Sequence, residues 1–409
     1  MFYGWWIVLI AFLTSAFAGA TVWYGFTAYF DPLVNEFGWS YTAISLAASF
    51  RGLEVGLMDI FVGLLVDRFG GRRIVLAGSI IMGIGYLMLS QVNTLTTFYI
   101  SFFIIFIGAS GASNVVLFQV VTRWFRKRLG LVIGLVSAGF GVSGFALPAI
   151  VYLLDILGFR LVFAVVGLAA ILIGSFAALF LRSRPEDMGL YPDGAPLSEN
   201  VPEPITSDII MTVISQKDHS IKEAIADLAF WITTYAGLVT GLSTMMISTH
   251  VMPYLKHIGY PRYMSSLVAM MIPVTSIIGR LGIGWISDLV GRKRVFVIAM
   301  LGQTTGVVLF LFAQQPFLLV SSVILFSISY GGIIVLRPAV FQDYYGRSYI
   351  GSLLGLSLGI ASLGSIAGPL LAGWIFDTTN SYSLAWVLCS VLLMVGVPLL
   401  LIMKKPLPR

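Results

Sequence analysis

The sequence predicts an all-α membrane protein, and three observations lead to that fold class. Of the 409 residues, 58% are hydrophobic and only 10% are charged, whereas soluble domains carry about 25% charged residues. Long apolar runs recur along the chain, and each suits a helix crossing a hydrocarbon core about 30 Å thick. The alternating pattern of β-barrel strands is absent. The chain is therefore expected to form a helical bundle in a lipid bilayer.

The predicted spans form two groups of six. The first group covers residues 5–30, 41–66, 73–92, 97–122, 129–154 and 158–181. The second covers residues 228–254, 262–287, 295–314, 317–342, 349–375 and 382–403. We therefore predict an N-terminal six-helix bundle (1–181), a polar linker (182–227) and a C-terminal six-helix bundle (228–409). The first span contains Ala16-Phe17-Ala18, which mimics a cleavage site, but its length and lack of a preceding basic residue predict a retained helix.

Basic residues concentrate on one side of the predicted membrane. Eighteen of the 24 lysines and arginines fall on the side of the N-terminus, and only Arg160, Lys256 and Arg262 fall in the opposite loops. The positive-inside rule then places both termini and the linker in the cytoplasm of a multi-pass inner (plasma) membrane protein. This topology explains the net charge of +6 without a nucleic-acid partner. Three more arginines lie inside predicted spans: Arg51, Arg280 and Arg337.

An internal repeat links the two groups of spans. A constant offset of 221 pairs identical residues across five helices: Pro32 with Pro253, Gly38 with Gly259, Gly63 with Gly284, Asp67 with Asp288, Arg73 with Arg294, Gly111 with Gly332, Gly134 with Gly355 and Pro148 with Pro369. An even number of spans gives both copies the same orientation, so the halves are parallel repeats. Such folds bind their ligand between the halves and expose it to each side in turn. The repeat therefore predicts a transporter.

Two loops carry a resemblance to a known family. The sequence GLLVDRFGGRR after the second span, and GWISDLVGRKR after the eighth, resemble the G-x-x-x-D-R-x-G-R-R loop of the major facilitator superfamily. Basic residues that only fix the orientation in the membrane would explain the arginines. They would not explain a glycine and an aspartate that repeat at the same positions in both loops. The glycine permits close helix packing, and the aspartate can brace the loop. The predicted gating residues are Gly63, Asp67, Arg68, Gly284 and Asp288, with Leu289 where the second copy lacks the arginine.

Three further stretches resemble the monocarboxylate and oxalate/formate porter branch of this superfamily. They are YGWWIVLIAF in the first span, RWFRKRLGLVIGLVSAGFGVSG entering the fifth and RSRPEDMGLYPDG after the sixth. This resemblance implies an arginine on the eighth helix that binds the substrate carboxylate, and Arg280 occupies that position. The residues agree, because a guanidinium matches a carboxylate in geometry and charge. The alternative is a structural arginine satisfied by a buried acid or by helix carbonyls.

Acidic residues of the second span are the candidates for proton coupling. The offset of 221 places Asp59 opposite Arg280, and burial would raise a carboxyl pKa towards the working range. A fixed counter-ion role is the alternative for Asp59. Glu54 is the second candidate, although Arg51, three residues earlier, shares its helix face and can form a structural pair with it.

Polar residues on other spans, together with Ser276 four residues before Arg280, complete the predicted substrate site. Tyr29 pairs with His250 by the same offset, and His250 either takes part in function or is solvated near the outer interface. Hydrogen bonds to substrate, or simply between helices, are expected from Asn114, Gln119 and Tyr330.

Departures from the family pattern bear on the substrate and its coupling. Ser276 stands where animal monocarboxylate transporters have an acid, the first helix has no lysine, and the eleventh helix lacks the second cation of oxalate exchangers. Proton coupling by that family's arrangement is therefore in doubt. The missing cation favours a singly charged substrate unless Arg51 or Arg337 reaches the cavity. For Arg337 we expect a structural or snorkelling role, with a place on the anion path as the alternative.

The sequence as a whole predicts a secondary active transporter of a small monocarboxylate such as lactate or pyruvate, working as a monomer by proton symport. Exchange of oxalate- or formate-type anions is the alternative mechanism, and a membrane-embedded carboxylate sensor is the alternative of another class. No enzyme is expected, since no nucleophile pattern appears and the histidines lack metal-ligand spacing. Gly139-Phe140-Gly141-Val142-Ser143-Gly144 fits a dinucleotide motif but lies inside an apolar span. Neither cofactor nor metal is expected.

Overall fold

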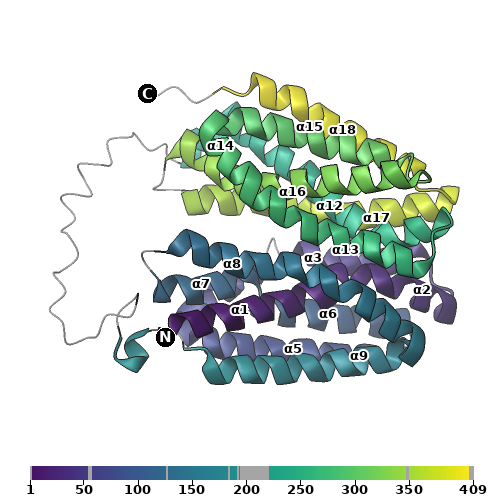
Figure 1. The fold of residues 1–409 in the computed structure, drawn as a ribbon, viewed down its shortest axis with the longest axis horizontal. Helices are drawn as coiled ribbons and strands as arrows, with labels where there is room; N and C mark the ends of the chain where they lie inside the picture. Colours follow the sequence, from purple (N-terminus) through teal and green to yellow (C-terminus); the bar gives the residue numbers. More distant parts are fainter. Residues whose placement is uncertain are drawn as a thin grey trace.

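The computed structural model describes residues 2–53, 58–125, 128–182, 185–190, 193, 221–346 and 350–404. Every regular element in this part of the chain is a helix, and the long helices run side by side along the longest axis of the molecule (Figure 1). The predicted all-α class is confirmed.

Within its described residues, the first half of the chain contains nine α-helices: α1 Gly4–Ala18, α2 Phe26–Phe37, α3 Tyr41–Leu53, α4 Asp59–Phe69, α5 Gly71–Ser90, α6 Leu95–Gly111, α7 Asn114–Trp124, α8 Leu129–Val142 and α9 Leu147–Phe180. A π-helical segment, η1 (Gly19–Tyr24), joins α1 to α2, and a 3-10 turn, η3 (Ser143–Ala146), joins α8 to α9. A second 3-10 turn, η4 (Pro185–Met188), follows α9.

The second half has a parallel organisation. Its elements are α11 Ile221–Ala226, α12 Leu228–His257, α13 Arg262–Ile278, π-helical η6 Gly279–Ile283, α14 Gly284–Val290, α15 Arg292–Phe310, α16 Pro316–Tyr345, α17 Ile350–Thr379 and α18 Ser383–Ile402. The eighth predicted span is therefore one continuous rod made of α13, η6 and α14, with a π-helical segment in its middle.

The structure is consistent with the twelve predicted membrane crossings. Ten helical stretches of the described residues are long and apolar enough to cross a membrane. One of them, Leu129–Phe180, contains two crossings because the backbone leaves the helical region at Gly158 (φ 74°, ψ 160°). Glycine adopts this conformation without strain. The second predicted span corresponds to α3 and α4, which flank residues 54–57 outside the described ranges.

The same backbone turns recur in both halves at the offset found in the sequence. Gly38 ends α2 with φ 65°, and Gly259 follows α12 with φ 98°. Gly70 precedes α5 with φ 81°, and Gly291 precedes α15 with φ 104°. Positive φ favours glycine at each of these four positions. The repeat therefore preserves backbone geometry as well as residue identity.

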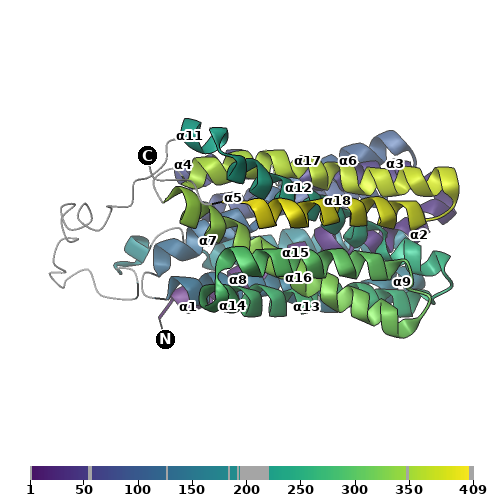
Figure 2. The ribbon, with the colours of Figure 1, turned by 90° about the horizontal axis from the view of Figure 1, so that it is seen from above.

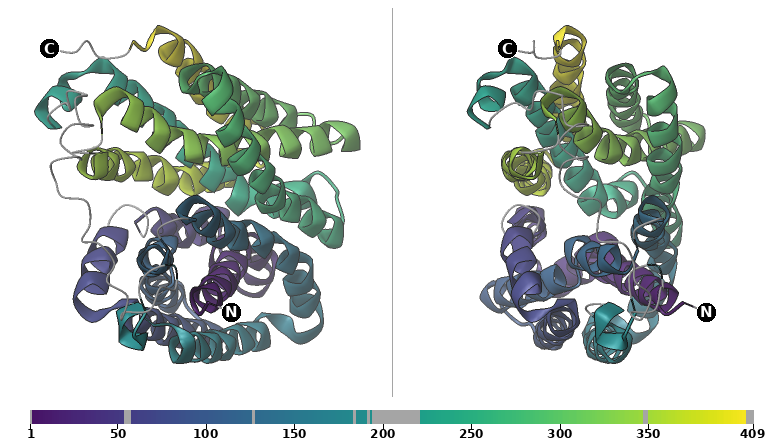
Figure 3. Two further views of the ribbon diagram at one scale, coloured as in Figure 1. Left: turned by 60° about the vertical axis from the view of Figure 1, so that its left-hand side comes forward. Right: turned by 90° about the vertical axis from the view of Figure 1, so that its left-hand side faces the viewer.

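Viewed along the helices, the two halves form separate bundles that face one another (Figure 3, right). Helices α5, α6 and α9 pack together in the first bundle, and α12 with α17 and α15 with α16 in the second. Between the bundles, α3 packs on α17, α2 on α12, and α13 on α8 and α9. We call the end at which α1 begins and α18 ends the terminal face, and the other end the opposite face (Figure 2).

Hydrophobic packing differs between the two faces. One buried cluster joins side chains of both halves, including Phe30 and Val251. A second cluster, with Ile7 and Val120, belongs to the first half alone, and a third, with Phe230 and Tyr345, belongs to the second half alone. Because the last two clusters lie towards the terminal face, each half there has a core of its own.

Candidate functional site

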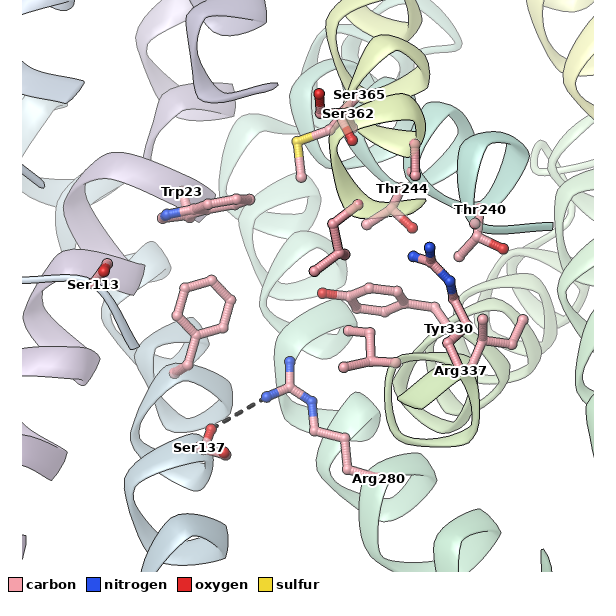
Figure 4. Close-up of a pocket in the computed structure, with 18 of the residues that line it drawn as sticks. Trp23, Ser113, Ser137, Thr240, Thr244, Arg280, Tyr330, Arg337, Ser362 and Ser365 are labelled. Carbon is pink, nitrogen blue, oxygen red and sulfur yellow. Dashed lines mark hydrogen bonds between the residues drawn. The ribbon is translucent and has the colours of Figure 1, made fainter. Parts of the chain in front are cut away.

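A cavity of about 460 Å³ lies between the two halves. Its volume falls in the range of small-molecule sites. The first half contributes Ser15, Ala18, Trp23, Ala109, Ala112, Ser113, Phe118, Ser137 and Phe140. The second half contributes Gly237, Thr240, Gly241, Thr244, Met245, Arg280, Tyr330, Ile333, Ile334, Arg337, Leu358, Ala361, Ser362 and Ser365. The walls are largely apolar, with two arginines and a set of hydroxyl groups as the polar features (Figure 4).

Arg280 projects into the cavity from the π-helical segment η6. Its neighbour Gly279 lies against α16 so closely that a Cβ atom there would be 1.9 Å from the carbonyl oxygen of Ile328. This contact fixes the backbone from which the arginine extends. The Nη1 group donates to the carbonyl oxygen of Ser137, 3.3 Å away across the cavity, and the guanidinium carbon lies 5.8 Å from the ring centroid of Phe140. Within the described part of the chain, the buried Nε–H has no hydrogen-bond partner.

Arg337 is the second cation of the cavity and comes from α16, one residue before Pro338. Its Nη2 group donates to the hydroxyl of Ser357, 3.0 Å away, and its Nε–H is buried without a partner. The guanidinium lies against the backbone of α12, where a Cβ atom on Gly237 would be 2.2 Å from its central carbon. Among the described residues, neither Arg280 nor Arg337 forms an ion pair.

Hydroxyl groups of α12 and α17 form the polar part of the remaining wall. Thr240 donates to the side-chain oxygen of Gln303 over 3.2 Å, whereas the hydroxyl of Thr244 is buried without a partner. Ser362 donates to the carbonyl oxygen of Gly359 over 2.7 Å. Among these three hydroxyls, Thr244 is therefore the one best able to hydrogen-bond a ligand; in the first-half wall the Ser113 hydroxyl is likewise buried without a partner among the described residues.

The predicted substrate residues fall into two groups. Arg280 and Tyr330 line the cavity. Gln119 does not, although its neighbour Phe118 does, and its side-chain oxygen is buried without a partner. Asn114 begins α7, and its side chain lies outside what the structure describes.

Three other predicted residues are buried away from the cavity lining. The Tyr29 hydroxyl donates to the carbonyl oxygen of Thr21 over 3.0 Å, and the Ser276 hydroxyl donates to that of Pro273 over 2.7 Å. His250 is fully buried, so the solvated alternative for this residue is wrong. Its Nε2 lies 3.0 Å from both the Ser45 hydroxyl and the carbonyl oxygen of Pro369, and its Nδ1 lies 3.1 Å from the Tyr382 hydroxyl.

The residues predicted for proton coupling are only partly described. Glu54 and the side chain of Asp59 lie outside the described residues. Arg51 is fully buried and does not line the cavity. Its guanidinium donates to the carbonyl oxygens of Ala48 and Trp23 at 3.1 and 2.7 Å and to the hydroxyl of Thr249 on the other half.

The two copies of the loop motif make ion pairs on the terminal face. Asp67 pairs with Arg123 at 2.9 Å. In the second copy Arg292 pairs with Asp343 at 2.7 Å and with Asp288 at 3.6 Å. Arg68 lies over the ring of Phe69, 5.3 Å from its centroid.

The motif glycines are not tightly packed. A Cβ atom on Gly63 would lie 3.6 Å from the nearest atom, the side-chain nitrogen of Gln119, and one on Gly284 would lie 3.5 Å from Val335. Both are ordinary contact distances, so close packing does not require glycine at these positions in this conformation.

Polar contacts join the halves at the opposite face. Asp377 of α17 accepts hydrogen bonds from the backbone N–H groups of Tyr41 and Thr42 at the start of α3, at 3.0 and 2.8 Å. Two ion pairs also cross between the halves: Lys256 with Asp31 at 3.0 Å, and Arg262 with Asp155. The halves are therefore held together at this face by charge as well as by the shared hydrophobic cluster.

Several cavity residues were not predicted from the sequence. They are Trp23, Ser137, Thr240, Thr244, Ser362 and Ser365. Arg337 also lines the cavity, as in the alternative that gave it a place on the anion path. The available signal was spacing: Thr240 and Thr244 are four apart, and Ser362 and Ser365 three apart, so each pair shares one helix face.

Comparison with known proteins agrees with the fold. The sequence profile described as "Major Facilitator Superfamily" matches residues 9–288 and 266–409. The chain is 24% identical over 398 residues to monocarboxylate transporter 13 of Bos taurus, covering 96% of this chain and 88% of that protein. It is 21% identical over 366 residues to the MFS-type transporter YhjX of Escherichia coli, covering 88% and 86%.

Solved structures show the same architecture. A bacterial homologue of the human lysosomal transporter Spinster, in an inward-facing and unoccupied conformation, superimposes with a TM-score of 0.73 at 16% identity, covering 97% of this chain and 96% of that one. At this identity the match shows the fold alone.

Proposed function

Because the chain belongs to the major facilitator superfamily, we propose that it is a secondary active transporter of small carboxylates, with lactate- and pyruvate-like monocarboxylates as its smallest substrates. The observation that carries this proposal is Arg280, whose guanidinium lies in the cavity between the halves with a buried, unpartnered Nε–H. A guanidinium presents parallel donors that match a carboxylate, and charge-assisted hydrogen bonds of this kind are stronger than neutral ones. The similarity to a protein named monocarboxylate transporter 13 supports the same substrate class.

Transport would proceed by alternating access. In this conformation charge pairs and a shared hydrophobic cluster join the halves at the opposite face, whereas the halves have separate cores towards the terminal face. This arrangement fits a carrier whose cavity is accessible from the terminal face. We propose that this face is cytoplasmic, because most of the basic residues fall in its loops, and that the protein works as a monomer in the plasma membrane.

Proton symport is the proposed coupling, with Asp59 or Glu54 of the second predicted span as the proton carrier. Anion exchange is the competing mechanism, and it needs no titrating acid. The two mechanisms differ in what drives accumulation: a proton gradient in the first case and an internal anion in the second.

The test is uptake of radiolabelled lactate into proteoliposomes that contain the purified protein. An inward proton gradient should raise the initial rate several-fold over the rate without a gradient, and protein-free liposomes serve as the control. Uptake indifferent to the proton gradient but stimulated by internal lactate would replace symport by exchange. Binding without any accumulation would remove transport and favour a sensor.

A further inference from the structure

We propose that Arg337 binds a second acidic group of the substrate, so that small dicarboxylates bind this cavity more tightly than monocarboxylates. This inference rests on the proposed carboxylate transport and specifies the substrate class of the same site. Arg280 holds one carboxylate, and Arg337 holds the other. Monocarboxylates occupy the Arg280 position alone.

The first support is the state of the Arg337 side chain. A guanidinium has five N–H donors, and only one hydrogen bond, to the Ser357 hydroxyl, is made by this one within the described residues. Its Nε–H is buried and unpartnered, and no carboxylate of the described chain pairs with it. A buried polar group left without a partner destabilises the state that contains it. A ligand carboxylate would satisfy these donors.

Comparison with Arg51 shows what a structural arginine looks like in this molecule. The Arg51 guanidinium donates to the carbonyl oxygens of Ala48 and Trp23 and to the hydroxyl of Thr249, and it does not line the cavity. Arg337, in contrast, lines the cavity and makes no hydrogen bond to a backbone carbonyl among the described residues. Its guanidinium is therefore held in place by the bond to Ser357 and by contact with Gly237, while other donors stay available.

The two arginines do not converge on one point. In Figure 4 the ring of Tyr330 lies between the guanidinium group of Arg280 and that of Arg337, and the hydroxyl-bearing Thr240 and Thr244 lie on the Arg337 side. A ligand that meets both cations therefore carries an acidic group at each end. Thr244, whose hydroxyl is buried without a partner, is placed to bond a polar group beside the second carboxylate.

Cavity size and charge favour the same class of ligand. A volume of 460 Å³ corresponds to about fifteen water molecules at roughly 30 Å³ each, so a three-carbon acid leaves most of it unfilled. A monoanion also neutralises only one of the two guanidinium groups, and an uncompensated charge in a poorly solvated site is unfavourable. A linear acid with a carboxylate at each end fills more of the cavity and neutralises both guanidinium groups.

The test compares matched acids as competitors of radiolabelled lactate uptake in proteoliposomes at about pH 7.5, where both carboxyls of a diacid are ionised. Succinate and butyrate have the same carbon chain and differ by one carboxylate. Succinate should inhibit at a concentration at least about tenfold lower than butyrate. In Arg337→Gln the ratio of the two inhibitory concentrations should fall to less than about threefold, since loss of one partner of a buried charged pair weakens binding by tenfold or more.

Two further variants test the assignment if Arg337→Gln folds poorly. Arg337→Lys keeps the charge and should keep part of the succinate advantage. Gly237→Ala leaves Arg337 intact but places a methyl group 2.2 Å from its guanidinium carbon, so the side chain must move and the succinate advantage should shrink. Thermal stabilisation of the purified wild-type protein by succinate and butyrate gives the same ranking without transport.

The possible results distinguish a failure of the Arg337 assignment from a failure of carboxylate transport. Lactate uptake with equal inhibition by succinate and butyrate, or a succinate advantage unchanged in Arg337→Gln, overturns the role of Arg337 and leaves carboxylate transport intact. If no carboxylate is taken up or stabilises the wild-type protein, the proposed function itself fails.

Discussion

Asp377 caps α3 from the other half of the molecule: its carboxylate accepts hydrogen bonds from the backbone N–H of Thr42, at 2.8 Å, and from the hydroxyl of the same residue, at 2.5 Å. The first N–H groups of a helix have no partner within the helix, and an acidic side chain is a favourable partner for them. Here that partner comes from α17, about 335 residues further along the chain. The N–H groups of Tyr41 and Thr42 therefore have this partner only while the halves are closed at the opposite face, whereas the N–H of Ala43 bonds the local Ser40 hydroxyl.

Removal of this cap should favour opening of the opposite face. Asp377→Ala loses hydrogen bonds that stabilise closure, and loss of a cap costs about 1 kcal/mol, which is roughly a fivefold change in the ratio of closed to open molecules. Spin labels at Ser40→Cys and Asn380→Cys, in a Cys389→Ala background, would report the change as a longer distance population. Thr378→Ala is the matched control, since Thr378 bonds only within its own helix, and it should leave the distances unchanged. An unchanged distribution in Asp377→Ala would exclude a role for this contact in closure.

Arg280 should be essential for transport and dispensable for insertion. Arg280→Gln removes the charge that pairs with the substrate. Loss of such a partner is expected to lower the initial rate of lactate uptake more than about thirtyfold. Arg280→Lys keeps the charge but loses the planar fork, so about tenfold loss is expected. Initial rates of lactate uptake, normalised to the amount of folded protein in the liposomes, measure both. Wild-type uptake by Arg280→Gln would show that the carboxylate binds elsewhere.

Substitution of two glycines on the eighth span should have different effects: Gly279 is needed for packing, whereas Gly284 is not. A Cβ atom at Gly279 would lie 1.9 Å from a backbone oxygen of α16, so Gly279→Ala should destabilise the protein by about 1–3 kcal/mol. At Gly284 the nearest atom would be 3.5 Å away, so Gly284→Ala should leave the thermal midpoint within a degree or two. Thermal unfolding in detergent compares them. If Gly284→Ala slows transport at unchanged stability, the role of Gly284 lies in the conformational change. An equal loss of stability in both variants would contradict the predicted difference in packing.

His250 should matter for stability and conformation more than for substrate affinity. It bonds with Ser45, Tyr382 and the carbonyl oxygen of Pro369, and it does not line the cavity. In His250→Ala these buried groups lose a partner, at a cost of about 1–3 kcal/mol. The expected result is a lower thermal midpoint with the half-saturating lactate concentration changed less than about twofold. A large change in half-saturation alone would instead place His250 on the substrate path.

The fold could be predicted because its signals are local or periodic. Long apolar runs and the offset of 221 depend on the sequence alone, and the paired glycines Gly70 and Gly291 keep the same positive φ. Arg280 could be predicted as a cavity residue because the family resemblance implies an arginine at its position on the eighth span. Charge in an apolar span does not by itself distinguish it from Arg51, which does not line the cavity.

Other site residues could not be predicted, because their surroundings come from distant parts of the chain. Arg337 stands near the end of its span, which suggests snorkelling, but its guanidinium position depends on Gly237 of another helix. His250 stands near the end of a span as well, and it is buried only because α3, α17 and Tyr382 cover it. Thr244 resembles any threonine in a membrane helix until the cavity is seen.

The unequal composition of the two cavity walls has a kinetic consequence. Both arginines of the cavity belong to the second half, whereas the first half lines it with aromatic, small and hydroxyl-bearing residues. On the proposed function, an anion would therefore be held mainly by the second half while the first half moves against it. Substitutions in the second-half wall should change how tightly the cargo is held, whereas those in the first-half wall should change how fast the loaded carrier turns over. The twofold repeat of the backbone thus supports two different tasks, one for each copy.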